Sequence, residues 1–184
     1  MSGTRQEDPI TERCARELIE PSPETWQQVR EAFLQIEKAH FGEGGLSEEE
    51  FAESFNDPDS IIVLTRDVEG EKIVGFTFTQ PVEHVYGGEF HPERPKFPKT
   101  AYVVNTGLDP NYVGHKLIGP MMDVLEKELV RRGYEFIERD AATANNYAGN
   151  IKKAYGESIL ESQEHQSQYG DQVFFRIKLL ESTK

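Results

Sequence analysis

The segment from Thr100 to Gly133 constrains the fold of this chain more than any other part of the sequence. Thr100 to Leu108 is rich in apolar and β-branched side chains, as in a strand, and Pro110 then redirects the chain through a turn. From Leu117 to Arg132, apolar residues recur every three to four positions, which is the period of an amphipathic helix, and a glycine follows. The apolar positions of this predicted helix are Leu117, Ile118, Met121, Met122, Leu125 and Leu129. A strand that leads directly into a helix indicates an α/β chain whose helix packs on a sheet.

The same periodicities predict the other elements. We expect strands over Arg13 to Glu20, Ile61 to Arg66, Ile73 to Thr79, Tyr134 to Asp140, Ser158 to Gln166 and Gln172 to Leu179. We expect helices from Glu24, from the capping box formed by Ser47 and Glu50, and over Asn145 to Tyr155. Val82 to Lys99 holds two glycines and three prolines and is predicted to be a long irregular loop. The order β-α-α-β-β-β-α-β-α-β-β predicts one domain over residues 1–184, with residues 1–10 as a flexible tail, but it does not give the order of strands in the sheet.

The charge of the chain excludes several kinds of partner. With 33 acidic and 20 basic residues the formal net charge is -13, so the surface repels nucleic-acid phosphates and anionic lipids. The longest aliphatic run, Ile61 to Leu64, is far shorter than the roughly 20 residues that a membrane span needs. We therefore expect a cytoplasmic protein with no nucleic-acid or membrane partner. The acidity either attracts a cationic amine or serves only solubility.

Several chemistries have no support in the sequence. The single Cys14 forms no intrachain disulfide, and the five histidines show no short metal-ligand spacing, so we expect no metal site. The chain has neither a Gly-x-Ser-x-Gly elbow nor a phosphate loop that ends in Gly-Lys-Ser/Thr. These absences disfavour a serine hydrolase and a nucleotide hydrolase.

The junction between the strand and the helix predicts an anion site. The first N–H groups of a helix have no intrahelical acceptor, and the helix dipole adds favourable potential for a negative charge. Gly114 would let a pyrophosphate approach the backbone closely, and His115 and Lys116 could add positive charge. Pro120 fits this position, because a proline in the first helical turn removes only an N–H that lacks an intrahelical partner.

Leu108, Pro110, Tyr112 and Gly114 stand at alternate positions before the apolar helix. This pattern and the order of elements resemble the acyl-coenzyme A (acyl-CoA) loop of the GNAT family of N-acetyltransferases. The resemblance implies an α/β (α+β) fold with a mixed, mostly antiparallel central sheet of about seven strands, flanked by about four helices. It also implies acetyl-CoA, or another acyl-CoA, as co-substrate.

The resemblance assigns residues to the co-substrate. Val113, Lys116 and Ile118 depart from the family, which has Arg or Gln before the first loop glycine and two further glycines at alternate positions after it. Gly119 is a candidate replacement for the last of these glycines. The positions that the resemblance gives to acyl-CoA are Thr106, Gly107, Leu108, Val113, Gly114, His115, Lys116, Leu117, Ile118, Gly119, Asn146 and Tyr155.

The resemblance also implies catalytic roles. In the family, a tyrosine at the end of the short helix protonates the departing thiolate, and Tyr155 matches it, although the spacing from Asn146 is two residues longer than usual. Tyr155 could equally be a core aromatic residue. A backbone amide between Asn105 and Leu108 would polarise the thioester carbonyl. For the general base, the candidates are Glu138 and Asp140 on the fifth strand, and Glu83 and His84 beside the long loop.

Three hypotheses follow for the function. The first is an N-acetyltransferase that transfers an acetyl group directly from acetyl-CoA to a small-molecule or peptide amine, with no covalent enzyme intermediate. The second is a catalytically silent GNAT-fold module that binds a ligand or a protein. The third is an α/β domain that never meets CoA. The long loop and the closing strands are candidate surfaces for a homodimer.

Overall fold

A seven-stranded sheet forms the centre of the computed structural model, which describes residues 9–85 and 99–180. The strand order is β1-β2-β3-β4-β5-β7-β6, and only the β4–β5 pair is parallel. The strands are β1 (Cys14–Ile19), β2 (Ile61–Asp67), β3 (Lys72–Pro81), β4 (Thr100–Leu108), β5 (Phe136–Ala142), β6 (Ile159–Ser167) and β7 (Gly170–Lys178). The predicted mixed, mostly antiparallel sheet is confirmed.

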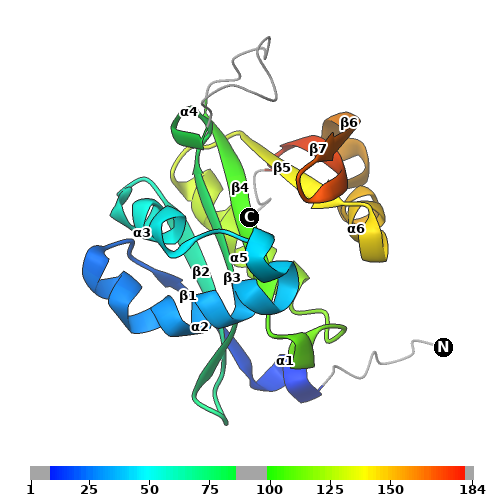
Figure 1. Ribbon diagram of the computed structural model, residues 1–184. Helices are drawn as coiled ribbons and strands as arrows, with labels where there is room; N and C mark the ends of the chain where they lie inside the picture. Colours follow the sequence, from blue (N-terminus) through cyan, green and yellow to red (C-terminus); the bar gives the residue numbers. More distant parts are fainter. Residues whose placement is uncertain (1–8, 86–98, 181–184) are drawn as a thin grey trace, which may run out of the picture.

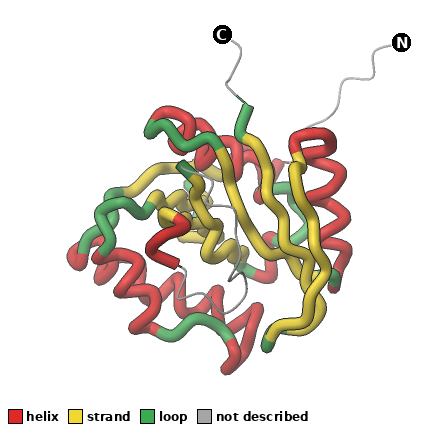
Figure 2. Tube along the Cα trace, turned by 90° about the horizontal axis from the view of Figure 1, so that it is seen from above, coloured by secondary structure: helices red, strands yellow, loops and turns green. Residues whose placement is uncertain are grey.

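Helices cover both faces of this sheet, as Figures 1 and 2 show. Within the described ranges the α-helices are α1 (Pro9–Arg13), α2 (Pro23–Phe41), α3 (Glu48–Asn56), α4 (Val82–Val85), α5 (Ile118–Arg131) and α6 (Tyr147–Tyr155). Short 3-10 turns are η1 (Gly42–Gly44), η2 (Pro110–Tyr112), η3 (Ala144–Asn146) and η4 (Gly156–Ser158). Because α1 and α4 are only five and four residues long, four helices carry most of the packing.

Two separate cores lie on the two faces of the sheet. On one face, Leu125 and Leu129 of α5 pack with Val63 and Ile137 in a largely aliphatic cluster. On the other face, α2 and α3 bury an aromatic cluster composed of Trp26, Phe33, Phe51, Phe55, Phe76 and Phe78. Gly107 lets α2 approach β4, because a Cβ there would lie 2.8 Å from Ile36 Cγ2. The apolar stripe predicted for α5 is therefore the face that this helix buries.

Local capping explains where two helices begin. The side chain of Ser22 accepts a hydrogen bond from Thr25 N at 3.0 Å and caps α2. At α3, Ser47 Oγ accepts from Glu50 N at 3.2 Å and Glu50 Oε2 accepts from Ser47 N at 2.7 Å, which is the predicted capping box. Both caps satisfy N–H groups that the helix itself leaves without acceptors.

The boundaries of several elements differ from the predictions. Pro9 and Ile10 belong to α1 instead of a tail, and residues 1–8 lie outside the described residues. In the predicted long loop, Val82–Val85 forms α4, and residues 86–98 are again not described. Strand β5 starts two residues later than predicted, because the turn after α5 takes up Tyr134, whose N–H donates to Leu129 O. None of the described helices has the length and apolar character needed to cross a membrane.

Candidate active site

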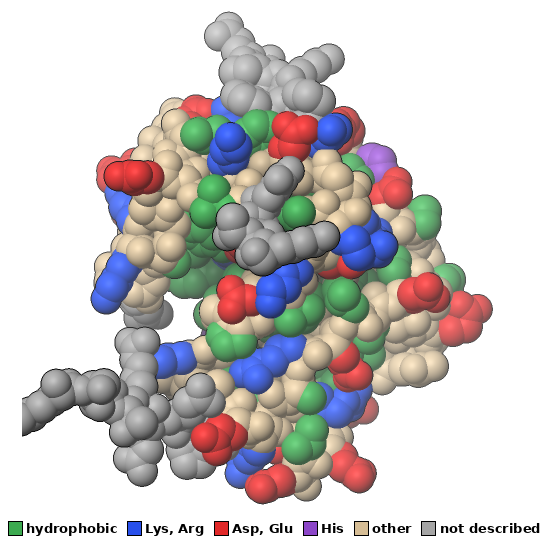
Figure 3. Space-filling view, turned by 180° about the vertical axis from the view of Figure 1, so that it is seen from behind, with side chains coloured by type: hydrophobic (Ala, Val, Ile, Leu, Met, Phe, Trp, Pro, Cys, Tyr) green, Lys and Arg blue, Asp and Glu red, His purple; other side chains and the backbone are tan. Residues whose placement is uncertain are grey.

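The central sheet opens between β4 and β5. These parallel strands pair only from Thr100 with Phe136 to Tyr102 with Glu138. Beyond this point β4 stays paired with β3 as far as Leu108, whereas β5 pairs only with β7. Figure 1 shows β5 turning away from β4 toward α6, and Figure 3 shows the outline of the molecule indented at the left edge, between α6 and the β4–α5 loop. We call this divergence the β4–β5 opening.

One edge of β4 faces the opening with its backbone. Asp109 N donates to Val74 O at 2.8 Å, so the backbone groups of residue 109 point toward β3. Because successive residues of a strand direct their N–H and C=O groups to opposite sides, those of Thr106 and Leu108 point toward the opening. The Leu108 carbonyl contacts His40 Nε2 of α2. Of the predicted range Asn105 to Leu108, Thr106 and Leu108 are thus the residues whose N–H groups a ligand in the opening could reach.

The loop after β4 is anchored to the β2–β3 turn. Asp109 forms an ion pair with Lys72, and its Oδ1 accepts from Asn111 N at 2.9 Å. The Tyr112 hydroxyl donates to Asp67 Oδ2, and this hydrogen bond, opposed by burial, lowers the pKa of the Asp67 carboxyl. These contacts fix both ends of η2, so the chain that follows enters α5 from a defined position.

Several backbone N–H groups at the start of α5 have no backbone acceptor. Met121 N is the first amide of α5 that bonds within the helix, donating to Leu117 O at 3.2 Å, so those of Ile118 and Gly119 have no intrahelical acceptor. Among the described residues, no backbone carbonyl accepts a hydrogen bond from the N–H groups of Gly114 and Lys116. Their φ angles of +93° and +56° turn the backbone sharply just before the helix. We call the N–H groups of Gly114, Lys116, Ile118 and Gly119 the amide cradle.

The space around the amide cradle is open. A Cβ built at Gly114 or at Gly119 would have no heavy atom within 4 Å. Ile118 is half-buried and packs against the α5 core, whereas Val113 is 55% exposed. The branched residue that departs from the family pattern at 118 therefore directs its side chain inward, and the backbone N–H groups stay accessible to an anion.

Tyr155 lies at the end of α6, against the core that α5 forms. Its hydroxyl donates to Glu126 Oε1 of α5. Burial, and then the neighbouring Glu126 carboxylate, raise the pKa of Tyr155 well above its ordinary value. The phenol therefore keeps its proton at neutral pH. Asn146, the other residue predicted on this segment, is solvent-exposed just before α6 with φ +57°.

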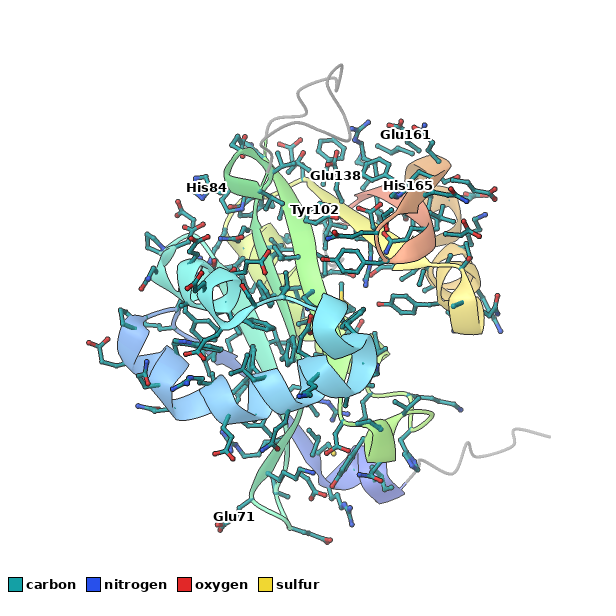
Figure 4. The ribbon with its side chains drawn as sticks, viewed as in Figure 1. Glu71, His84, Tyr102, Glu138, Glu161 and His165 are labelled. Atoms are coloured by element: carbon teal, nitrogen blue, oxygen red, sulfur yellow. The ribbon has the colours of Figure 1, made fainter. Side chains whose placement is uncertain are left out.

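The two predicted carboxylates of β5 have different partners. Glu138 is 2% exposed, and its Oε1 accepts from Arg176 Nε at 2.8 Å. Asp140 accepts from the Tyr102 hydroxyl at Oδ2, and its Oδ1 lies 2.8 Å from His165 Nε2. Figure 4 shows Tyr102, Glu138 and His165 in one region, at the last positions where β4 and β5 still pair. The Asp140 side chain is 19% exposed and that of Glu138 only 2%, so Asp140 is the one of the two that an incoming ligand could reach.

A third carboxylate on this face comes from α2. Glu37 is 3% exposed; its Oε2 accepts from Asn105 Nδ2 at 2.8 Å and its Oε1 from Leu46 N at 2.7 Å. Burial raises the pKa of Glu37, and the two hydrogen bonds oppose that shift. The carboxylate thus ties α2 to β4 beside the opening.

The other two base candidates lie elsewhere. Glu83 and His84 are on α4, beside the end of β4 at which it pairs with β5, and Figure 4 shows His84 well apart from His165. Nδ1 of His84 lies 2.7 Å from Asp57 Oδ2, and this contact raises the pKa of the histidine. One ligand atom each from Asp57, Asp59 and His84 lies within 4.8 Å of the others. The prediction of no metal site stays a prediction.

Sequence reasoning missed Tyr102, His165, Glu37 and Glu126. Tyr102 could have been found, because alternation along the fourth strand puts it on the face opposite its buried neighbours. His165 could not, since its approach to Asp140 depends on how β6 and β7 curl relative to β5. Glu37 and Glu126 are single acids within amphipathic helices, and acids in helices are mostly exposed.

Solved structures with the same fold are known. No protein-family model matches the sequence, and no curated protein matches it. The ribosomal-protein-S18-alanine N-acetyltransferase from Escherichia coli is 17% identical with a TM-score of 0.65, over 92% of this chain and 97% of that chain. The spermidine/spermine N-acetyltransferase from Vibrio cholerae is 12% identical with a TM-score of 0.61, over 92% and 95% of the two chains. An N-acetyltransferase from Staphylococcus aureus is 13% identical with a TM-score of 0.63, over 90% and 99%.

These likenesses establish the architecture. The chain has the fold of the GNAT-type N-acetyltransferases, and the predicted fold class is confirmed. At such low identities the likeness concerns the fold alone, so it assigns neither a substrate nor an activity to this chain.

Proposed function

We propose that this chain is an acyl-CoA-dependent N-acyltransferase, most simply an N-acetyltransferase, that acts on an amine. The observation that carries the proposal is the β4–β5 opening with the amide cradle at one end of it. N–H groups without acceptors at a helix N-terminus bind phosphate groups. Two of the proteins named above are N-acetyltransferases of an alanine of ribosomal protein S18 and of spermidine or spermine, which supports an amine as the acceptor here.

The residues around the cradle fit an acyl-CoA. Gly114 and Gly119 leave open space beside unbonded N–H groups, and Lys116 adds an exposed positive charge. The predicted contacts along β4 and the loop are retained, namely Thr106, Gly107, Leu108, Val113, Gly114, His115, Lys116, Leu117, Ile118 and Gly119, with Asn146 and Tyr155 on the other side of the opening. When bound, the thioester supplies an activated acetyl group. The Thr106 or Leu108 N–H would orient and polarise its carbonyl.

The chain's own groups would then handle the protons. An acceptor ammonium must lose a proton before its nitrogen can attack, and Asp140 would take that proton at a carboxylate oxygen. The Tyr102 and His165 side chains hold Asp140 in place. Tyr155 would hold a proton at its hydroxyl on the opposite side of the opening. Glu138 is assigned a positioning role, because Arg176 occupies its carboxylate.

One observation favours the catalytically silent alternative. The Tyr155 hydroxyl is bonded to Glu126, and a phenol that donates to a carboxylate releases its proton to another acceptor less readily. A GNAT-fold module that binds acyl-CoA without turnover would have the same cradle. The silent module would bind a ligand or a protein, whereas the enzyme would bind an acyl-CoA and an amine. A cytoplasmic location and a homodimer through β6 and β7 also stay proposals.

A thiol-release assay with acetyl-CoA and a panel of amines tests the proposal. We expect turnover with at least one cationic amine, and a decrease of about 10²-fold or more in Asp140→Asn. Glu83→Gln is the matched control, because it removes an exposed candidate base on α4 and should leave turnover unchanged. If no amine releases thiol while acetyl-CoA still binds, the silent module is correct. If Glu83→Gln abolishes turnover and Asp140→Asn does not, the base is misassigned.

A further inference from the structure

Arg139 is a buried guanidinium at the point where the sheet opens. It is 2% exposed and is the first residue of β5 after the last position that pairs with β4. A buried arginine normally meets oxygen acceptors, because each unsatisfied donor loses its hydrogen bond to water without replacement. Arg176, the other buried arginine of this region, follows that rule with the carboxylates of Glu138 and Glu161.

The partners of Arg139 do not satisfy its donors. Nη2 donates to the Tyr147 hydroxyl, and Cζ lies 5.3 Å from the centroid of the Tyr147 ring. Nη1 has the thioether Sδ of Met122 at 3.6 Å, which is a weak acceptor. Nε is buried and has no hydrogen-bond partner among the described residues. The Glu126 carboxylate accepts from Tyr155 and lies within electrostatic reach of the Arg139 guanidinium, but among the described residues no ion pair joins the two side chains.

The side chain is directed from β5 toward β4. Met122 Sδ, which Arg139 contacts, also lies 4.0 Å from Thr77 Oγ1 of β3. That hydroxyl is in turn 2.9 Å from Thr106 Oγ1, a residue whose backbone N–H faces the opening. The guanidinium therefore lies on the α5 face between the two strands that separate. A group with oxygen acceptors that entered between β4 and β5 would meet it.

We propose that Arg139 is a binding residue for the amide-containing arm of the acyl carrier, and that it donates from its guanidinium to a carbonyl oxygen of that arm. The inference rests on the proposed function, because it presumes that an acyl-CoA occupies the opening. The two ends of the opening, at Tyr102 and Leu108, are six residue steps apart along β4, or about 20 Å. The amide cradle thus holds the phosphates at one end, and Arg139 holds the arm toward the other.

Calorimetric titration of Arg139→Met with CoA, and with adenosine 3′,5′-bisphosphate, tests the proposal. The bisphosphate lacks the arm, so its binding should not change, whereas CoA should bind tenfold or more weakly. If Arg139 had only a structural role, the Arg139→Met protein would instead have a lower melting temperature and an unchanged affinity for CoA. The Arg139→Met protein without ligand should melt at the same temperature as wild type or higher, because an apolar side chain replaces donors that lack acceptors. Arg176→Met is the matched control, and should lower the melting temperature without weakening CoA binding.

A second measurement is independent of whether the Met variant folds. In wild-type protein labelled with ¹⁵N, the Nε–Hε resonance of Arg139, assigned by its loss in Arg139→Lys, should shift when CoA is added and not when the bisphosphate is added. An unmoved resonance on saturation with CoA, or equal CoA affinity in Arg139→Met, overturns the inference while leaving the proposed function standing. If the wild-type protein binds no CoA, the proposed function and this inference are both wrong.

Discussion

Gly119 should be less favourable than alanine for the stability of the free protein and more favourable for CoA binding. It occupies the first turn of α5 with no other heavy atom within 4 Å of the position its Cβ would take. The methyl group added in Gly119→Ala would displace no neighbouring atom. Alanine in a helix is more favourable than glycine by about 0.5–1 kcal/mol in the free energy of unfolding. For a chain of this length, that gain raises the melting temperature by about 1–4 °C. The added methyl group would stand beside the N–H groups of the amide cradle, where we expect the diphosphate.

The binding penalty should exceed the stability gain. We expect Gly119→Ala to weaken CoA at least tenfold, which is about 1.4 kcal/mol, by holding a phosphate away from the backbone. Denaturation and calorimetric titration of the same preparation measure both effects. Gly133→Ala is the matched control: this glycine also has open space around it, but it follows the other end of α5 with φ +85°. The control should lose stability and keep its CoA affinity. A Gly119→Ala protein that is more stable and binds CoA as tightly as wild type would refute the cradle.

Two further predictions concern the ionisable groups of α5. Glu126→Gln removes the charge next to Tyr155, so the pKa of Tyr155 should fall. An ultraviolet titration of tyrosinate measures this pKa, with Glu126→Gln/Tyr155→Phe as the comparison that identifies the signal of Tyr155. An unchanged titration curve would disprove the coupling between the two side chains. Hydrogen bonds from Arg131 and, to a smaller extent, Arg132 lower the pKa of Glu128 to about 2. The Glu128 carboxylate therefore stabilises the fold at pH values above its ordinary pKa, and this stabilisation disappears as the pH falls toward 2. Glu128→Gln should therefore lose about 1 kcal/mol at pH 7, given that Arg131 is largely exposed, and the deficit should shrink below about pH 4.5 in chemical denaturation. A deficit that stays constant with pH would contradict that linkage.

Local patterns predicted most elements of the fold. The Ser47 and Glu50 box and the apolar stripe of α5 are decided by residues close in sequence, so the sequence alone was sufficient to find them. The strand order was not predictable, because it depends on pairings between distant segments such as β5 with β7. Helix α1 was missed because five residues show too little periodicity.

The candidate site was predictable only where a backbone turn defines it. Gly114 and the start of α5 stood out because glycine and helix-start patterns are local. Arg139 was not singled out, since charged residues are mostly exposed and nothing in its neighbours predicts a buried guanidinium. The distinction between Glu138 and Asp140 also required the structure, because Arg176 and His165 reach them from strands late in the chain.

The most direct test of the account is a calorimetric titration of the wild-type chain with acetyl-CoA, followed by the same titration at higher salt. We expect saturable heat at one site per chain, with an affinity that weakens as salt screens the phosphates from the cradle and Lys116. No heat at high micromolar protein, or heat that Gly119→Ala leaves unchanged, would contradict the claim that the start of α5 binds the diphosphate of an acyl carrier.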